Sequence, residues 1–233
     1  MLACCRGGAI RVVWSPSSNL GLSENKNTHL LTQIALTYFV RAILLSERIE
    51  IEKMDVLQET IAVYERLRKK RYRIIVETGE DFTFVFQPAN YHHLAGFQHL
   101  TDFQNISSPK SKDQFYGLVK RQHLQEEYVQ ESSHYNEISE RLNTFSYLED
   151  ILAEGVGKII VEYDRSKLSS EIEAKYYLYK RVGRALDGEV TYHILFIGSM
   201  NERFFPATYI VEHSNIYIRE QELRTCQIIH QEK

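Results

Sequence analysis

The stretch Phe84-Val-Phe-Gln-Pro-Ala-Asn-Tyr-His-His-Leu-Ala-Gly-Phe-Gln-His-Leu-Thr-Asp102 organises this chain, because an apolar strand pattern runs into Pro88 and a short helix pattern follows it. The helix pattern carries His92, His93 and His99 among apolar and aromatic residues. Three of the chain's nine histidines therefore fall within one short element. Imidazole exchanges protons near neutral pH, so any chemistry of this protein is expected here.

The composition indicates a globular protein with no strong overall charge. The chain has 233 residues, of which 43% are hydrophobic and 25% charged, both ordinary values. This length suits one large domain, or one domain with an extension. The formal net charge is −3, so a polyanion would have to be bound by a local basic patch.

The three cysteines indicate neither a disulfide framework nor a zinc site. Cys4 and Cys5 are adjacent, Cys226 is far away, and no C-x-x-C pair occurs. A reducing compartment, the cytoplasm, is therefore expected. No run of about 18 apolar residues is present, so we expect no membrane-spanning helix. The acidic residues show no metal-ligand spacing, and we expect neither a metal nor a cofactor.

The order of patterns along the chain suggests one main domain with extensions. Residues 1–27 have turn and coil composition and are expected to form a tail. Residues 28–53 are expected to add an N-terminal helix, which either binds a partner or packs on the main domain. The main domain is expected over 54–224, followed by a C-terminal tail over 225–233.

Within the main domain, helical spacing comes first and strand alternation later. Helices are expected over 54–69, 114–122 and 135–152, and a hairpin over 72–77 and 82–86. From Gly155 onward the period changes to two, and strands are expected over 159–163, 174–181, 190–197, 204–211 and 222–229. This order predicts an α+β fold, with N-terminal helices followed by a four- to five-stranded antiparallel sheet.

A dense basic stretch lies at the end of the second expected helix. One interpretation is contact with a phosphate backbone, with Tyr72 near enough to stack on a base. The other is a solvated cationic helix end that complements the helix dipole. The six basic residues within eight positions are Arg66, Arg68, Lys69, Lys70, Arg71 and Arg73.

Five stretches of the chain form a recognisable set, namely Phe86–Asp102, Arg141–Glu149, Val161–Leu168, Ala174–Lys180 and Phe205–Thr208. Together they resemble the phage-associated nuclease domains of the barnase–EndoU–colicin–RelE-like superfamily, over roughly residues 54–224. The resemblance implies helices followed by a four-stranded antiparallel sheet, and metal-independent cleavage of RNA, often by a toxin or by a phage or mobile-element effector. RNA, including tRNA, is then the expected partner, and an immunity or antitoxin protein is a further candidate.

Metal-free RNA cleavage uses the 2′-hydroxyl of the substrate as nucleophile. It needs a base, an acid and cationic donors around the phosphate. Within the resembling motif, His93 is the first candidate for base or acid, with His92 beside it, and helical spacing predicts that His93 is the more buried of the two. The alternative for either residue is a hydrogen-bonded core histidine.

Further candidates come from the strand-rich half of the chain. Lys167 follows a strand and a turn, and is expected either to supply the cation or to be a solvated turn lysine. His193 and Thr208 are expected on neighbouring strands, where they either complete the site or hydrogen-bond to each other. Tyr177 and Arg181 share a face of one strand and are expected to bind RNA by stacking and charge, or to belong to an edge strand with one core face.

Two functional classes on this fold remain open from the sequence, beside a third in which a phage or mobile-element interaction protein dimerises through the helix expected from Thr28 to Ser46. The first is a metal-independent ribonuclease-like domain. The second is a non-catalytic module on the same fold that binds RNA or a protein, which the slightly acidic net charge favours.

Overall fold

The computed structural model describes residues 55–168, 170–183 and 190–233, and the structural statements below concern these residues. The tail expected over 1–27 and the helix expected over 28–53 lie outside the described residues.

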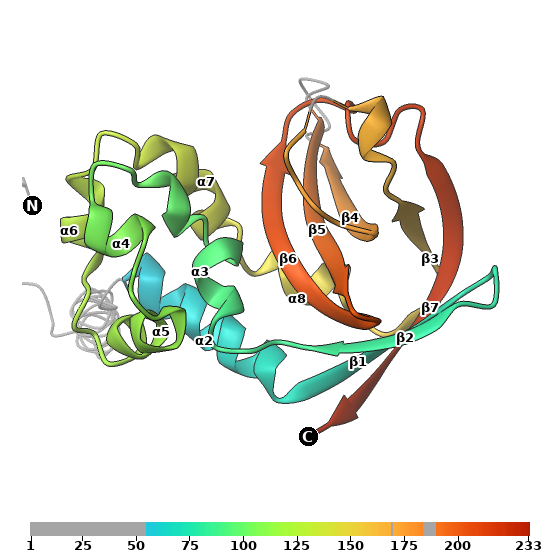
Figure 1. Ribbon diagram of the computed structural model, residues 1–233, viewed down its shortest axis with the longest axis horizontal. Helices are drawn as coiled ribbons and strands as arrows, with labels where there is room; N and C mark the ends of the chain where they lie inside the picture. The colour runs from blue at the N-terminus through green and yellow to red at the C-terminus, as the bar shows by residue number, and fades with distance from the viewer. Residues whose placement is uncertain (1–54, 169, 184–189) are drawn as a thin grey trace, which may run out of the picture. The chain divides into compact units, whose positions relative to one another are not determined.

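Helices lie together on one side of a strongly curled sheet (Figure 1). The α-helices are α2 (Val56–Arg68), α3 (Asn90–Leu94), α4 (Gln104–Ser107), α5 (Lys112–Lys120), α6 (Glu126–Gln130), α7 (Asn136–Asn143) and α8 (Tyr147–Ile151). Two 3-10 turns are η1 (Phe97–His99) and η2 (Arg165–Lys167). The strands are β1 (Lys70–Val76), β2 (Asp81–Val85), β3 (Gly155–Glu162), β4 (Tyr176–Gly183), β5 (Val190–Met200), β6 (Arg203–Glu212) and β7 (Glu222–Glu232).

Helix α2 has clear local reasons to begin and end where it does. The Asp55 carboxylate accepts a hydrogen bond from the backbone N–H of Leu57 at 2.7 Å and so caps the N-terminus. Arg66 and Arg68 lie in the last turn, where cations complement the helix dipole. Leu57 and Tyr64 on one face are fully buried, so tertiary packing holds the helix on the domain.

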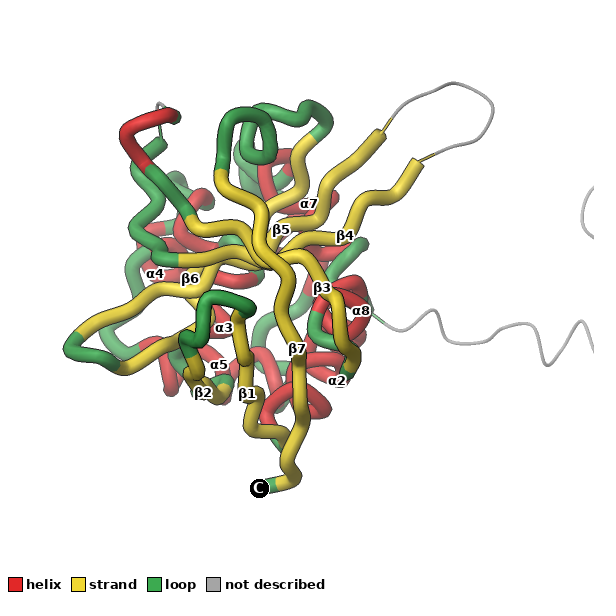
Figure 2. The backbone as a smooth tube through the Cα atoms, turned by 90° about the vertical axis from the view of Figure 1, so that its right-hand side faces the viewer, coloured by secondary structure: helices red, strands yellow, loops and turns green. Residues whose placement is uncertain are grey.

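The sheet has the strand order β2-β1-β7-β3-β4-β5-β6, and every neighbouring pair is antiparallel. Figure 2 shows these strands in front of the helices. In a row of seven antiparallel strands, the first and the last run in the same direction. The edge strands β2 and β6 approach each other, with Phe82 stacked on Phe204 at 4.1 Å between ring centroids. The described residues form no ladder between them, so the curled sheet stays open along one seam.

Alternation along the strands produces two cores. The inner face of the curl continues into the helical layer, and β1 contributes Tyr72, Ile74 and Val76 to it. A second, smaller cluster lies on the outer face of the meander, where segments next to the sheet cover Tyr177 and Phe196. The solvent side of β1 therefore carries Arg71 and Arg73, while Tyr72 points inward.

The α+β class is confirmed, but the expected strand number is wrong, because the sheet has seven strands. The hairpin β1–β2 lies in sequence between α2 and the later helices, and its hydrogen bonds to the rest of the sheet run through β7. Residues 225–233, expected to be a tail, lie largely in β7, which pairs with both β1 and β3. The helix expected over 135–152 is two helices, α7 and α8.

Within the described part of the chain, none of the helices has the length and apolar character needed to cross a lipid bilayer.

Two substitutions in β7 test its role at the centre of the sheet. Ile228 is 1% exposed, so Ile228→Ala should lower the free energy of unfolding by about 2–5 kcal/mol through lost packing and a cavity. Leu223 on the same strand is 48% exposed, so Leu223→Ala should change it by no more than about 0.5 kcal/mol. Urea unfolding followed by circular dichroism measures both. Equal effects would contradict the buried position of β7.

Candidate functional site

The stretch that carries His92, His93 and His99 follows β2 and forms the short helix α3 and the 3-10 turn η1. The Asn90 side-chain oxygen accepts a hydrogen bond from the Gln87 backbone N–H at 2.8 Å and supports the start of α3. Helix α3 packs along β6. It ends at Leu94, and Gly96 with a φ of +88° reverses the chain into η1. This left-handed conformation suits glycine, and it brings His93 and His99 to the two sides of one turn.

His92 is a core residue. It is 1% exposed, and its Nε2 lies 2.7 Å from the carbonyl oxygen of Ile106. A carbonyl only accepts, so Nε2 carries the hydrogen and donates it. Burial lowers the pKa of His92. The expectation that His93 is the more buried of the pair is wrong, because α3 is only five residues long and its orientation is set by the surrounding Phe97 and Phe115 rings rather than by its own helical spacing.

His93 is partly exposed and contacts the ammonium group of Lys112 through its Nε2. Burial, followed by the positive charge of Lys112, lowers the pKa of His93 to about 4. Lys112 is the first residue of α5, and the preceding Ser111 caps that helix by accepting from the Gln114 backbone N–H. His93 is therefore neutral at pH 7, and the lone pair on its Nε2 faces the Lys112 ammonium.

Arg141, on α7, is a buried cation without a partner. It is 9% exposed, and its Nε and Nη1 have no hydrogen-bond partner among the described residues. Burial lowers the pKa of Arg141 to about 10, so the guanidinium stays charged at pH 7. A Cβ atom at Gly96 would lie 2.7 Å from Nη1 of Arg141. The absence of a side chain at Gly96 therefore lets the guanidinium lie against the turn.

His99 lies on the turn around Gly96, where the charge of Arg141 affects its pKa. Its Nε2 accepts a hydrogen bond from the Gln98 amide at 3.1 Å, which puts the ring hydrogen on Nδ1. Nδ1 faces a carboxylate oxygen of Glu137 at 4.0 Å. Burial, followed by the charge of Arg141, lowers the pKa of His99, and Glu137 opposes this. We call His93, Gln98, His99 and Arg141, which surround Gly96, the Gly96 cluster.

The Gly96 cluster offers two imidazoles on one turn and a guanidinium from α7 that lies against it. A buried unpaired charge is unfavourable, and an anion such as a phosphate would compensate it. Guanidinium also matches phosphate through two parallel hydrogen bonds. Sequence reasoning missed Arg141 as a site residue although the resembling stretch Arg141–Glu149 begins with it. Nothing in its local pattern distinguishes it from a solvated helix arginine.

His193 holds the sheet to the helices instead of joining this cluster. It is buried, and its Nδ1 lies 2.9 Å from the Tyr209 hydroxyl, which donates to the Thr144 carbonyl at 2.9 Å. Tyr209 uses its only hydrogen on Thr144, so His193 donates to Tyr209. Thr208 pairs with Phe196 across β5 and β6, so it lies on the opposite face of the sheet from His193. The structure does not bring Thr208 and His193 together.

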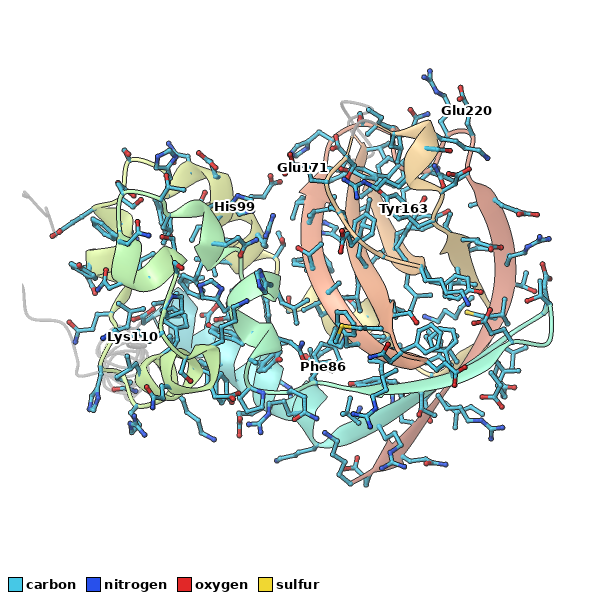
Figure 3. The ribbon with its side chains drawn as sticks, in the orientation of Figure 1. Phe86, His99, Lys110, Tyr163, Glu171 and Glu220 are labelled. Atoms are coloured by element: carbon cyan, nitrogen blue, oxygen red, sulfur yellow. The ribbon has the colours of Figure 1, made fainter. Side chains whose placement is uncertain are left out.

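Lys167 also lies away from the Gly96 cluster. Its ammonium group donates to the backbone carbonyl of Glu220 at 2.9 Å and lies 3.9 Å from Asp164. Figure 3 labels Glu220 at the far end of the sheet and His99 in the helical layer. The pairing of Lys167 with His93 in one site is therefore wrong, because η2 is at the opposite side of the domain from α3.

The basic stretch is divided between ion pairs and free charges. Arg66 pairs with Glu149, Arg68 with Glu65 and Arg73 with Asp81, and Lys70 lies 3.5 Å from His230. Tyr72 is buried, so its ring is not available to a base. Lys69 and Arg71 are exposed and make no ion pair with the described residues.

The expected RNA-binding face of β4 is only half exposed. Tyr177 is fully buried, and its hydroxyl donates to the backbone carbonyl of Tyr217. Its ring cannot stack on a base in this arrangement, because the segment that contains Tyr217 covers it. Arg181, four residues along the strand, is exposed.

No group of three or more histidine, cysteine or acidic side chains gathers in metal-ligand geometry within residues 55–168, 170–183 and 190–233.

The family model described as phage-Barnase-EndoU-ColicinE5/D-RelE like nuclease4 matches residues 56–233. The chain belongs to this nuclease family. The match starts at the first residue of α2 and runs through β7 to the last residue, so it spans the helical layer, the sheet and the Gly96 cluster. No curated protein and no solved structure matches the chain. The resemblance inferred from the sequence is confirmed, and this nuclease domain extends beyond the expected boundary at 224.

Two glycine substitutions separate backbone strain from the close approach of Arg141. Gly79 and Gly96 both have positive φ, but a Cβ at Gly79 would meet nothing within 4 Å. Gly79→Ala should destabilise the domain by about 1–2 kcal/mol, the cost of a left-handed alanine. Gly96→Ala should cost at least about 1 kcal/mol more, because Arg141 must move. Thermal and urea unfolding check this. Equal losses would show that Arg141 does not need the space at Gly96.

Proposed function

We propose that this nuclease-family protein is a metal-independent endoribonuclease, and that the Gly96 cluster is its catalytic site. The observation that carries the proposal is the buried guanidinium of Arg141, which comes from α7 and lies against Gly96, in the turn that carries His93 and His99. A guanidinium beside a turn with two imidazoles has the charge and the proton-transfer groups that cleavage of a phosphodiester requires.

Arg141 is proposed to bind the phosphate that is cleaved. Its Nε and Nη1 have no hydrogen-bond partner among the described residues, so its positive charge is not compensated within the domain and attracts the phosphate. Negative charge increases on the non-bridging oxygens in the transition state, and the charge of a nearby guanidinium stabilises it.

His93 and His99 are proposed to move the protons. The 2′-oxygen attacks phosphorus and gives its proton to His93, the bond from phosphorus to the 5′-oxygen breaks, and the leaving oxygen takes a proton from the imidazolium form of His99. The products are a 2′,3′-cyclic phosphate and a free 5′-hydroxyl. A bound phosphodiester would offset the charges of Lys112 and Arg141 and so raise the pKa of both histidines toward neutrality. Glu137 further favours the protonated form of His99.

A non-catalytic binding module on the same fold is the second candidate. The contact of Lys112 with Nε2 of His93 favours it, since this nitrogen is already occupied. A tRNA substrate, a toxin role, an immunity or antitoxin partner and a cytoplasmic location all stay predictions from the sequence.

An RNA-cleavage assay in EDTA separates the two candidates. The full chain should cleave total RNA and tRNA. It should leave a DNA oligonucleotide with the sequence of the tRNA intact, because DNA lacks the 2′-hydroxyl. His93→Ala should lose activity by about 10²-fold or more, as expected for a general base. His123→Ala, which changes an exposed histidine, should keep full activity. Arg141→Gln should lose activity while circular dichroism shows the domain still folded.

The possible results of this assay distinguish the ribonuclease from the binding module. Cleavage that needs a divalent metal, or equal cleavage of DNA, would contradict the 2′-hydroxyl mechanism. RNA retained without cleavage by folded protein would support the binding module. Full activity in His93→Ala would remove the Gly96 cluster from the mechanism.

The pH dependence of cleavage tests the role of Lys112. His93 as base must be unprotonated in the free enzyme, so kcat/KM should fall on the acid side at the pKa of His93, about 4. Lys112→Met removes the nearest positive charge, which should raise this pKa and move the acid limb of the profile to higher pH. Lys110→Met, in the loop before α5, should leave the limb in place. If the acid side of the kcat/KM profile stays at the same pH in Lys112→Met, another group is the base.

A further inference from the structure

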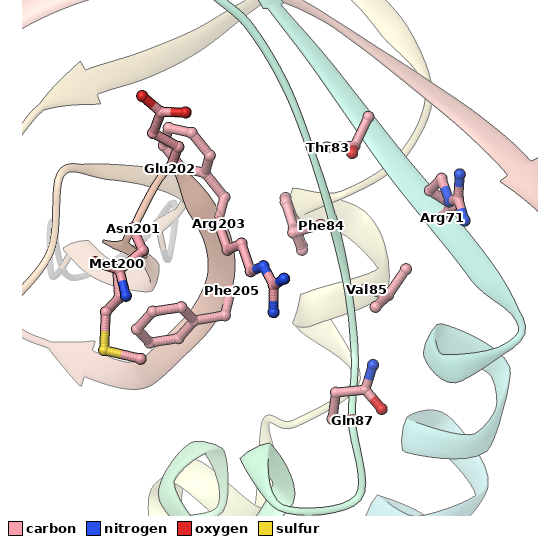
Figure 4. A pocket seen from close by; sticks show the side chains of 11 residues that line it. Arg71, Thr83, Phe84, Val85, Gln87, Met200, Asn201, Glu202, Arg203 and Phe205 are labelled. Atoms are coloured by element: carbon pink, nitrogen blue, oxygen red, sulfur yellow. The ribbon is translucent and has the colours of Figure 1, made fainter.

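The open seam of the sheet forms a groove on the outer side of the domain. Figure 4 shows it between β2 and the turn that joins β5 to β6. Its volume is about 870 Å³. Inward-facing Phe84 and Phe204 form its floor, because their rings belong to the inner core. Its walls come from outward-facing residues of both edges, namely Arg71, Thr83 and Val85 on one side and Arg203 and Phe205 on the other.

The two arginines of this groove are its distinctive feature. Arg71 on β1 and Arg203 on β6 are exposed, and neither makes an ion pair or a side-chain hydrogen bond with the described residues. Arg73, two residues from Arg71 on the same face of β1, is instead held by Asp81. In Figure 4 the Arg203 guanidinium reaches from β6 toward β2, with Arg71 on the far side of β2. Two free guanidinium groups on opposite sides of a groove suit successive phosphates of one chain.

The aromatic wall of the groove is held in a defined place. Phe205 pairs with Gly198 across β5 and β6, and a Cβ at Gly198 would lie 2.6 Å from the Phe205 ring. The ring therefore lies over the backbone of β5, where glycine leaves room for it. It stays partly exposed beside Arg203 and the exposed Met200. An exposed ring next to free arginines is the combination that binds single-stranded nucleic acid through base stacking and backbone charge.

We propose that this seam groove binds a single-stranded segment of the RNA substrate, with phosphates on Arg71 and Arg203 and a base on Phe205. The choice of RNA rests on the proposed ribonuclease function. The groove reaches Gln87, three residues before the start of α3, so it ends beside the element that carries His93. RNA held there extends toward the Gly96 cluster.

A polypeptide strand fits the seam less well. Completing the sheet would require a strand between β2 and β6 with about 4.8 Å of spacing on each side. The stack of Phe82 on Phe204, at 4.1 Å between centroids, already joins the two edges. The groove is therefore a surface channel with a closed floor, and its two arginines, against the one exposed carboxylate of Glu202, favour a polyanion.

Binding of an uncleavable oligonucleotide tests the groove separately from catalysis. The probe is a fluorescein-labelled 2′-O-methyl oligouridylate of about eight nucleotides, a length in the range of single-strand sites. Its methyl groups remove the nucleophile. Fluorescence anisotropy with the full chain should show Arg71→Ala and Arg203→Ala weakening binding about tenfold, and each should lower the slope of log Kd against log salt by about one.

Further variants identify the base contact and provide a matched control. Phe205→Ala should weaken binding about tenfold with an unchanged salt slope, because it removes stacking and not charge. Phe205→Tyr should restore binding. Arg73→Ala removes an arginine from the same face of β1 that is already paired, and should stay within about twofold of the wild type.

Each result decides the proposal. Equal Kd values for Arg203→Ala, Arg73→Ala and the wild type would overturn the groove as an RNA site, even if the wild type cleaves RNA. Failure of the wild type to bind the probe would overturn it as well. Probe binding that depends on Arg71, Arg203 and Phe205 would support the groove, including in a protein that proves unable to cleave RNA.

Discussion

The pairing of β7 with both β1 and β3 is the interaction on which the rest of the domain depends. It joins the hairpin β1–β2, which follows α2, to the meander β3–β6, which follows the later helices, in one continuous sheet. Because β7 is the last strand in the chain and lies inside the sheet, the sheet forms only when the whole domain is present. Its contacts join residues that are far apart in sequence, and closing such loops costs entropy.

This pairing also explains the seam. Inserting β7 between β1 and β3 makes a row of seven antiparallel strands, whose edges β2 and β6 run in the same direction. The aromatic stack of Phe82 on Phe204 brings the edges together without a hydrogen-bonded ladder. Natural proteins protect such edges, and here Pro206 lies in β6, where the lack of an N–H is tolerated. The seam leaves a groove with two arginines, Arg71 and Arg203, that make no ion pair with the described residues.

The Gly96 cluster depends on a different constraint, the space left by one glycine. Gly96 ends α3 with a positive φ, and its missing side chain allows Arg141 from α7 to lie against the turn. Burial, and after it this charge, lowers the pKa of His99, as burial and then Lys112 lower that of His93. Burial and the nearby cations thus keep both imidazoles neutral until an anion binds. Binding of a phosphodiester and protonation of the histidines are therefore coupled in the proposed site.

The sequence by itself determined the α+β class, the strand alternation after Gly155, the family and the histidine turn, because these depend on local periodicity and on residues close together in the chain. Only the tertiary structure decided which groups meet. It buried His92, Tyr72 and Tyr177, put His193 and Thr208 on opposite faces of the sheet, and brought Arg141 to Gly96. Burial and pairing depend on the packing of elements distant in sequence, and no local pattern records which face such a neighbour covers.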